Sequence, residues 1–492
     1  MIPRWPRRRC LAAPLLALLV GAPGLVAAQA PPAAASCIAC HGAQGEGQAA
    51  PGYPRLAGLP ADYLQRQLQA YAGGMRANPI MTPLARAMSA AERDQVAAYF
   101  SALPAPARAA SAAPVVAADV AELALRGRWS EGLPGCMQCH GPQGVGVGAI
   151  PPLSGQPARY LAAQLQAWQG GKRPPGPLGL MASVAARLSA ADVAALANHF
   201  GTGPRAVPGP AAVEPARAVA TGFVPPPLST IPDNEFGKVV RQGLAIFEHT
   251  GTNAPAFSGN ALACVNCHLD AGRLAGASPL WAAYLAYPAY RAKNGHVNTF
   301  EERMQGCFRF SMNGKAPPLG SPTLVALQSY AYWLASGARV DPNLPGRGYP
   351  KLAKPASAPD RARGEKVFAA DCAFCHGPEG QGQQAGAVQV FPPLWGPRSF
   401  NWGAGMGSVA NAAAFVKANM PLGRGGSLSD QDAWDVALFM DSHERPQDPR
   451  FVDSVAVTRQ RFHDSPMSMY GRRVDGVLLG EQSVPAGGST VH

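Results

Sequence analysis

Apolar residues recur at helical spacing in four short segments spread along the chain. Each segment begins at a serine, and three of the four carry an acidic residue at the third helical position, which is a typical helix start. Apolar side chains then follow every three or four residues, as on one buried face of a helix. We therefore predict amphipathic helices, whose apolar faces form core and carry no chemistry, over residues 89–100, 189–200, 321–334 and 429–440.

One part of this pattern occurs twice. Residues 63–76, YLQRQLQAYAGGMR, align with residues 160–173, YLAAQLQAWQGGKR, which indicates an internal duplication over residues 31 to about 203. A chain of 492 residues has room for about three or four small domains. Segments rich in Pro, Ala and Gly, which favour extended linkers, lie at residues 104–118, 201–232 and 346–360.

The first thirty residues have the composition of a secretory signal. A basic start precedes an apolar run that Pro14, Gly21 and Pro23 interrupt, and Ala28-Gln29-Ala30 resembles a cleavage site. No later stretch approaches the roughly 20 apolar residues of a membrane-spanning helix. We expect residues 1–30 to be removed and the mature chain to be periplasmic, without a membrane span. An uncleaved membrane anchor is the alternative.

The cysteines are the first residues to indicate chemistry. Of the ten, eight form four copies of Cys-x-x-Cys-His. This motif attaches c-type haem through two thioether bonds, and its histidine binds the iron. A zinc site of paired cysteines is the alternative, but it needs no histidine after every second cysteine. We predict four covalently bound haem c groups attached at Cys37 and Cys40, Cys136 and Cys139, Cys264 and Cys267, and Cys372 and Cys375, with iron bound by His41, His140, His268 and His376.

The expected fold class is mainly α, because one haem motif falls in each predicted unit. We expect four class I cytochrome c-like domains, each around one covalent haem, joined by Pro/Ala/Gly-rich linkers. Haem fills part of the core in such a domain, which can therefore fold with few apolar side chains. The expected boundaries are a signal peptide at 1–30, domains at 31–105, 119–203, 231–345 (catalytic) and 360–445, and a C-terminal extension at 446–492.

The duplication also predicts the sixth iron ligand of the first two domains. Met81 aligns with Met181, and they lie 40 and 41 residues after the motif histidines, whereas Met88 aligns with Leu188. A methionine ligand raises the haem potential. We therefore predict Met81 and Met181 as the axial ligands.

In the fourth domain the corresponding ligand is predicted from spacing alone. Met420 lies 44 residues after His376, close to the spacing in the duplicated domains. Met406 and Lys417 stay open as alternatives.

The third domain offers a cysteine at the equivalent distance. Cys307 lies 39 residues after His268, while Met304 and Met312 lie 36 and 44 residues after it, so spacing does not decide. With eight cysteines in haem motifs and Cys10 in the signal, Cys307 is an odd thiol in an oxidising compartment. It is either a buried inert cysteine or a thiolate on ferric iron. We favour the thiolate, because anionic sulfur stabilises that state and could host sulfur chemistry.

Basic residues surround Cys307 in the sequence. A charge cluster is often only a solvated surface, but beside a lone thiol it favours a pocket for a small oxoanion, which guanidinium groups bind in a bidentate way. The net charge of +12 falls by four without the arginines of the signal, and haem propionates would roughly cancel the rest, so we infer no nucleic-acid binding. The cations are Arg291, Lys293, Arg303, Arg309 and Lys315.

The motifs ACVNCHLDAGR, YPAYRAKNG, ERMQGCFRFSMNGK, CAFCHG, FPPLWGPRSFNWGAGM and NMPLG follow one another between about residues 230 and 445. This part of the chain resembles the dihaem thiosulfate dehydrogenases, in which these motifs occur in the same order. The resemblance implies that Cys307 is the axial ligand of an active-site haem. It also implies oxidative coupling of two thiosulfates to tetrathionate, with release of two electrons.

The same resemblance implies roles for further residues. Arg303, Ser311 and Lys315 fall in the stretches that shape the family's anion pocket, and Lys293 stands where other members have arginine. Some members have a lysine beside the methionine of the second haem. Asn419 stands there in this chain, which favours Met420 as the ligand.

Residues 37 to about 203 resemble the tandem dihaem cytochromes of the c-four class, which act as electron acceptors. The two resemblances together imply an enzyme fused to its acceptor, with electrons passing through four haems to an external periplasmic acceptor such as a high-potential soluble redox protein or a terminal oxidase. Only six residues separate Ala30 from Cys37, so the helix that usually opens such a domain is expected to be missing or very short.

Two other functions stay open at this point. A sulfur-oxidation cytochrome that transfers thiosulfate to a carrier protein also uses a cysteine-ligated haem, and a plain tetrahaem electron-transfer protein needs no substrate. The sequence leaves open the direction of the reaction, the order of electron flow through the N-terminal haems and the oligomeric state.

Overall fold

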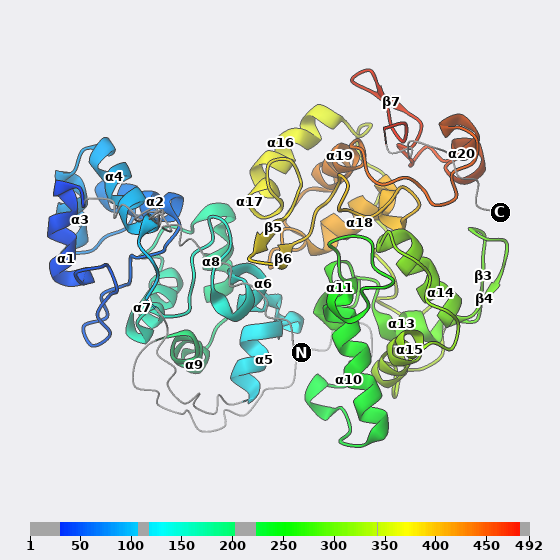
Figure 1. The fold of residues 1–492 in the computed structure, drawn as a ribbon, viewed down its shortest axis with the longest axis horizontal. Coiled ribbons are helices and arrows are strands. Elements are labelled where there is room, and N and C mark those ends of the chain that lie inside the picture. Colours follow the sequence, from blue (N-terminus) through cyan, green and yellow to red (C-terminus); the bar gives the residue numbers. More distant parts are fainter. Residues whose placement is uncertain (1–29, 107–117, 202–222, 342, 483–492) are drawn as a thin grey trace, which may run out of the picture.

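The computed structural model describes residues 30–106, 118–201, 223–341 and 343–482. It is mainly helical, with short two-stranded hairpins, which confirms the predicted fold class. Figure 1 shows two halves side by side, one running from α1 to α9 and the other from α10 to α20. We call them the N-terminal and C-terminal halves. The predicted signal peptide lies outside the described residues, except for its last position.

The two repeats of the N-terminal half have the same helix order. In each repeat the haem-motif helix is followed by a long helix, a short helix and a closing helix. The elements are α1 (Ala35–His41), α2 (Ala61–Ala72), α3 (Met81–Ala87) and α4 (Ala90–Ala102) in the first, and α6 (Cys136–His140), α7 (Ala158–Gln169), α8 (Leu180–Ala185) and α9 (Ala190–Phe200) in the second.

The repeats differ at their start. The second opens with α5 (Ala118–Arg126) and a hairpin of β1 (Gly127–Arg128) and β2 (Leu133–Pro134). In the described residues of the first, a single 3-10 turn, Pro32–Ala34, precedes α1. Among the described residues, which begin at residue 30, the first haem motif thus lies on the first α-helix of its repeat.

The C-terminal half begins with α10, which packs against α15 later in the chain. The core around this pair of helices contains Trp281 and Tyr330. A π-helix labelled η7 follows α14 directly. The elements in order are α10 (Glu235–Glu248), α11 (Thr250–Asn253), α12 (Leu269–Gly272), α13 (Leu280–Leu285), β3 (Ala289–Arg291), β4 (His296–Asn298), α14 (Phe300–Gly306), η7 (Cys307–Ser311) and α15 (Pro322–Leu334).

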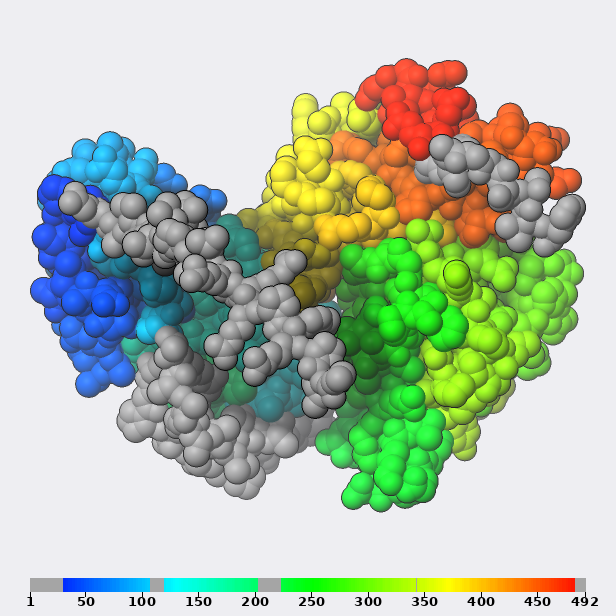
Figure 2. Space-filling model, viewed as in Figure 1, coloured from blue at the N-terminus to red at the C-terminus, as the bar shows by residue number. Residues whose placement is uncertain are grey.

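The rest of this half forms a second core, to which the chain's last described residues contribute. Residues 446–482, here called the C-terminal segment, place Val455, Tyr470 and Leu479 in the same hydrophobic cluster as Phe368 of α16. Figure 2 shows this orange and red segment packed against the rest of the C-terminal half. The elements are α16 (Arg361–Asp371), α17 (Ala373–His376), β5 (Gln383–Ala385), β6 (Val388–Phe391), α18 (Val409–Asn419), α19 (Asp430–Asp441), α20 (Val455–Phe462), β7 (Arg473–Val474) and β8 (Val477–Leu478).

All four predicted amphipathic helices are present as α4, α9, α15 and α19. The side chains of Ser89, Ser189 and Ser429 accept the backbone N–H of the acidic residue three positions later. Ser321 makes no such bond, and α15 instead begins with Pro322, whose fixed φ suits the first helical position.

In the described part of the chain no single helix has the length and apolar content of a membrane span; one pair bent by 115°, Pro177–Ala185 and Ala190–Phe200, meets those criteria together.

Candidate active site

The four motif histidines share one arrangement. Each Nδ1 donates a hydrogen bond to a backbone carbonyl, which leaves Nε2 as the free base that binds a metal. Desolvation lowers the pKa of each imidazole, so the neutral form is favoured at neutral pH. The bonds run from His41 to Pro54 (2.7 Å), His140 to Pro151 (2.7 Å), His268 to Ser278 (2.7 Å) and His376 to Pro392 (2.9 Å).

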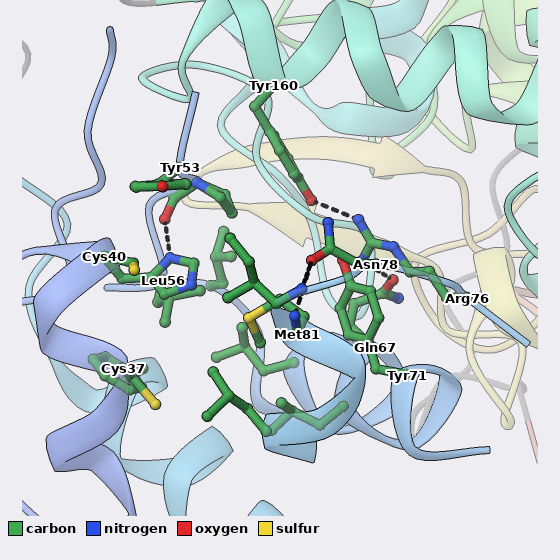
Figure 3. Close-up of a pocket in the computed structure, with 18 of the residues that line it drawn as sticks. Cys37, Cys40, Tyr53, Leu56, Gln67, Tyr71, Arg76, Asn78, Met81 and Tyr160 are labelled. Carbon is green, nitrogen blue, oxygen red and sulfur yellow. Dashed lines mark hydrogen bonds between the residues drawn. The ribbon is translucent and has the colours of Figure 1, made fainter. Parts of the chain in front are cut away.

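The first repeat encloses a cavity of about 320 Å³ around its haem motif. Figure 3 shows Cys37 and Cys40 at one side of this cavity and Met81 across from them. Met88 also lines the cavity. Two thiols, an imidazole and an opposite thioether are the donor set that haem c requires, so these residues fit the group.

The second repeat encloses a corresponding cavity of about 210 Å³. Cys136, Cys139, His140 and Met181 line it, and Leu188 takes the place that Met88 has in the first. Leucine cannot bind iron, so among the residues described for these cavities Met81 and Met181 are the methionines that occur at aligned positions in both repeats, and they stay the predicted ligands.

A wall of polar side chains separates these two cavities. Each of two buried arginines donates to both of two glutamines, at 2.5 to 3.1 Å, and to the tyrosine of the other repeat, at 3.2 to 3.3 Å. The sequence analysis missed these residues, although they occupy equivalent positions in the aligned repeats. They are Tyr63, Gln67 and Arg76, and Tyr160, Gln164 and Arg173.

In the C-terminal half, Met420 caps the end of α18 and packs in a cluster with Leu269 and Phe415. The alternative Lys417 is engaged elsewhere, because its Nζ donates to the Leu428 carbonyl (2.6 Å) and pairs with Asp430 (3.0 Å). The other alternative, Met406, packs between three hydrophobic clusters.

Cys307 lies at the first position of the π-helix η7, and π-bulges often mark functional sites. Arg303, one turn earlier on α14, donates from Nη1 to the Cys307 sulfur at 2.9 Å. The Cys307 thiol also interacts electrostatically with Cys264 and Cys267 of the haem motif. The interaction with the Cys307 sulfur is the largest cause that raises the pKa of Arg303, and it outweighs the opposing effect of burial. A permanently charged guanidinium thus faces the thiol.

The two methionines that compete with Cys307 lie in the hydrophobic core. Met304 is 6 % exposed and Met312 is 3 % exposed, and both belong to the cluster around Trp281. Cys307 is partly exposed. The packing therefore favours the cysteine as the group that reaches a ligand.

The structure brings together only part of the predicted cationic cluster. Lys293 lies near enough to Cys307 and Arg303 for both to affect its charge. Arg291, at the end of β3, and Lys315 are exposed, and Ser311 is partly exposed on η7.

Sequence analysis missed three residues next to this site. Phe310 on η7 lies against Lys293 and against Arg450 of the C-terminal segment, and Arg450 pairs with Asp448. Arg450 is 143 residues from Cys307 along the chain, so no local motif connects them.

The two halves meet where two haem motifs come together. Cys139 and Cys375 pack in one apolar cluster with Val147, Ile150 and Phe391, and Cys139 lies near enough to Cys375 to contribute to the raised pKa of its thiol, of which burial is the main cause. Side chains of the C-terminal half also line the second cavity, namely Phe374 and Leu422. A salt bridge of 2.9 Å between Arg126 on α5 and Glu248 on α10 adds a polar contact between the halves.

Three known protein families match successive parts of the chain, two parts in the N-terminal half and two in the C-terminal half. The cytochrome c family matches residues 30–104 and 133–202. The family described as SoxA/TsdA, cytochrome c domain, matches residues 254–340. The family described as cytochrome C oxidase, cbb3-type, subunit III, matches residues 359–440.

Comparison with curated proteins decides the family. A thiosulfate dehydrogenase of Thiomonas intermedia (strain K12) is 58 % identical over 310 residues, which cover 63 % of this chain and 95 % of that protein. The chain belongs to the thiosulfate dehydrogenases. A thiosulfate dehydrogenase electron acceptor of the same organism is 48 % identical over 205 residues, which cover 40 % of this chain and 93 % of that protein.

A solved structure spans both parts. The thiosulfate dehydrogenase (TsdBA) from Marichromatium purpuratum in its "as isolated" form has a TM-score of 0.82 and 48 % identity, over 90 % of this chain and 95 % of that one. The chain is accordingly a dehydrogenase part joined to an acceptor part, and it carries haem c groups in its cytochrome c domains.

Proposed function

We propose that the C-terminal half oxidises two thiosulfates to tetrathionate at Cys307 and that the N-terminal half receives the two electrons. The observation that supports this most directly is the hydrogen bond from Arg303 to the Cys307 sulfur. It places a nucleophilic sulfur and a fixed positive charge side by side, as the coupling of two dianions requires.

In this proposal Cys307 would bind the iron of the third haem site when haem is present, and it also carries the substrate sulfur. Its thiolate forms an S–S bond with the outer sulfur of one thiosulfate, and two electrons leave. The outer sulfur of a second thiosulfate then attacks this bond, tetrathionate departs, and the Cys307 thiolate returns. The sum is two thiosulfate dianions to one tetrathionate dianion and two electrons.

The side chains around Cys307 bind and orient the anions. Arg303 directs its guanidinium at the sulfur, and Lys293 adds a second cation, while Arg291, Ser311 and Lys315 complete the predicted pocket. When bound, each haem c accepts or gives up one electron, which is the redox chemistry that protein side chains lack.

The contact between the halves supports an order of electron flow that the sequence leaves open. Cys375 of the fourth haem motif lies beside Cys139 of the second, so electrons leave the C-terminal half toward the second site. The Tyr–Gln–Arg wall then leads to the first site. A fused acceptor is also present at high effective concentration, so transfer waits for no encounter.

The first haem site is the exit to an external acceptor in this scheme. Figure 1 shows α1 and α3 at the end of the molecule opposite the C-terminal half. We propose a periplasmic high-potential soluble redox protein or a terminal oxidase as that acceptor. Haem attachment and the predicted signal both agree with a periplasmic location.

The deciding experiment mixes purified protein with thiosulfate and ferricyanide and measures both products. We expect one tetrathionate for every two ferricyanides reduced, with no carrier protein added. Turnover that requires a carrier would make the chain a thiosulfate transferase, and no turnover at all would leave only electron transfer. Running the assay from tetrathionate with a reduced donor measures the reverse direction.

A further inference from the structure

The ring of Phe310 holds two cations from segments that are far apart in the sequence. The Nζ atom of Lys293 lies 3.7 Å from the ring centroid, and the guanidinium carbon of Arg450 lies 5.0 Å from it. Both distances are within the range of cation–π attraction. Phe310 itself is three positions after Cys307 on η7. The ring therefore connects the C-terminal segment to the reactive thiol.

Arg450 is held in place by a rigid set of partners. Its Nε and Nη2 donate to the two carboxylate oxygens of Asp448 at 3.0 and 2.6 Å. The Asp448 side chain is fully buried and also bonds His463 Nε2 at 2.9 Å. Phe462 lies 4.3 Å below the guanidinium, and His463 stacks on Tyr470. A bidentate pair so supported fixes a guanidinium more firmly than a lysine could.

Asp448 stays ionised in this environment. Burial opposes its negative charge, but the hydrogen bonds from His463 and Arg450 and the charge of Arg450 outweigh burial and lower the pKa of Asp448. The Arg450–Asp448 pair is thus a permanent ion pair at the edge of the site.

The loop before α18 also packs against Phe310. A Cβ atom on Gly403 would lie 2.5 Å from Phe310 Cδ1 and 3.0 Å from Asp448 Oδ1, so only glycine lets both approach. Asn401 is buried and donates its backbone N–H to the Phe310 carbonyl at 3.2 Å. The ammonium of Lys293 donates to the Gly403 carbonyl.

These contacts fix the orientation of the Lys293 ammonium group. An ammonium has three N–H donors, of which the Gly403 carbonyl takes one and the Phe310 ring faces another. Among the described residues no other hydrogen-bond acceptor of the ammonium is seen, so the third donor can bind an anion. If Phe310 moved, the ammonium would lose its cation–π contact and keep only the hydrogen bond to the Gly403 carbonyl.

We propose that Arg450 is a positioning residue for thiosulfate oxidation. Arg450 is ion-paired with Asp448 and packs on the Phe310 ring, and it thereby keeps that ring in the position that orients the Lys293 ammonium toward the substrate anion. This inference rests on the proposed function, because it takes the pocket beside Cys307 as the thiosulfate site. It makes the C-terminal segment part of the active site rather than an appendage. Figure 1 shows α20 and the β3–β4 hairpin, which leads to α14, at the same edge of the C-terminal half.

The test is a double-mutant cycle on the full-length haem-loaded protein, with ferricyanide as the acceptor. Arg450→Met and Lys293→Met are each expected to raise the KM for thiosulfate about 10-fold or more with little change in kcat, since both weaken anion binding. The double variant should show no larger KM than Lys293→Met alone, because Arg450 acts through Lys293. A residue with only a structural role would instead give additive effects.

Two further variants keep the result decisive. Phe310→Leu removes the ring but leaves the Arg450–Asp448 pair intact, so it answers the question if Arg450→Met does not fold, and it should raise KM in the same way. Arg461→Met replaces an exposed arginine of the same segment and should leave KM unchanged. Unchanged KM in Arg450→Met or Phe310→Leu, or additive KM effects, would overturn the inference. A wild-type protein that forms no tetrathionate would instead overturn the proposed function.

Discussion

Arg303 and Cys307 are joined by a hydrogen bond of 2.9 Å from the guanidinium Nη1 to the thiol sulfur. The two residues are four positions apart, the spacing that brings side chains together on one face of a helix. A charge-assisted donor at this place stabilises a thiolate and also attracts an anionic substrate. In the proposed reaction Arg303 thus has two roles: it stabilises the sulfur of Cys307 as an iron ligand, and it binds the substrate anion.

Replacing this guanidinium is expected to reduce thiosulfate oxidation strongly. We predict that Arg303→Met lowers kcat/KM by about 100-fold, because a charge-assisted hydrogen bond and a substrate cation are lost together. Steady-state assays with ferricyanide measure the effect. Lys354→Met, a change at an exposed lysine of the same half, is the control and should retain full activity. An Arg303→Met protein within threefold of wild type would contradict this role.

If Met81 and Met181 are iron ligands of the N-terminal half, replacing them should affect electron transfer but not the oxidation of thiosulfate in the C-terminal half. Each change to alanine should lower the midpoint potential of one haem, because a thioether ligand raises it. Tetrathionate formation with an artificial acceptor should continue. Redox titration of both variants measures this.

Met88→Leu is the matched control for these variants. Met88 lines the same cavity as Met81, and the second repeat already has Leu188 at that place. If Met88→Leu lowered the midpoint potential and Met81→Ala left it unchanged, Met88 rather than Met81 would be the iron ligand.

The contact between Cys139 and Cys375 predicts where electrons cross between the halves. Val147 is 4 % exposed in this contact, and a buried unpaired carboxylate costs several kcal/mol, so Val147→Asp should separate the surfaces. We predict that thiosulfate then reduces the N-terminal haems at least about 10-fold more slowly in stopped-flow measurements, because an unpaired carboxylate opposes the close packing of the two surfaces.

A neighbouring valine gives the control for this experiment. Val145 lies in the same loop but is 52 % exposed, so Val145→Asp should leave the rate unchanged. Equal rates in the two variants would place the crossing elsewhere.

Substrate binding is predicted to weaken above about pH 8. Although Lys293 is exposed as a residue, desolvation of its ammonium lowers the pKa of Lys293 to about 8. Repulsion by Arg450 and Arg303 acts in the same direction, and Asp448 and Cys307 oppose it. Lys293 is charged below this pH and neutral above it, so kcat/KM for thiosulfate should be flat on the acid side and fall on the alkaline side.

The arginine variant tests this assignment without changing the charge at neutral pH. Lys293→Arg stays protonated throughout the accessible range, so its alkaline decline should disappear. A decline that persists in Lys293→Arg would assign the titration to another group.

Local patterns in the sequence predict most of the fold. The Cys-x-x-Cys-His motifs, the four amphipathic helices and the duplicated segment each depend on residues close together in the chain, and all are present in the structure, with a serine side chain capping three of the four helices. The bond between Arg303 and Cys307 also follows from a spacing of four residues. Such features need no knowledge of distant contacts.

Other parts of the site depend on distant segments. The Tyr–Gln–Arg wall arises because two repeats pack face to face, although its residues are identical in the aligned repeats and a residue-by-residue comparison would have found them. Arg450, Phe310 and Lys293 meet only through the packing of the C-terminal segment. No periodicity in the sequence indicates that meeting, so the sequence alone describes residues 446–492 as an extension without a role.

The most direct test of the account is the change Cys307→Ser, measured by haem content, absorption spectrum and thiosulfate oxidation in one preparation. Four haems should remain attached, because attachment uses the other eight cysteines. Oxidation should fall to background and the spectrum of the third haem should change, since a hydroxyl is a poor iron ligand and forms no S–S bond with thiosulfate. Substantial turnover with an unaltered spectrum would contradict the account and return Met304 or Met312 as the ligand.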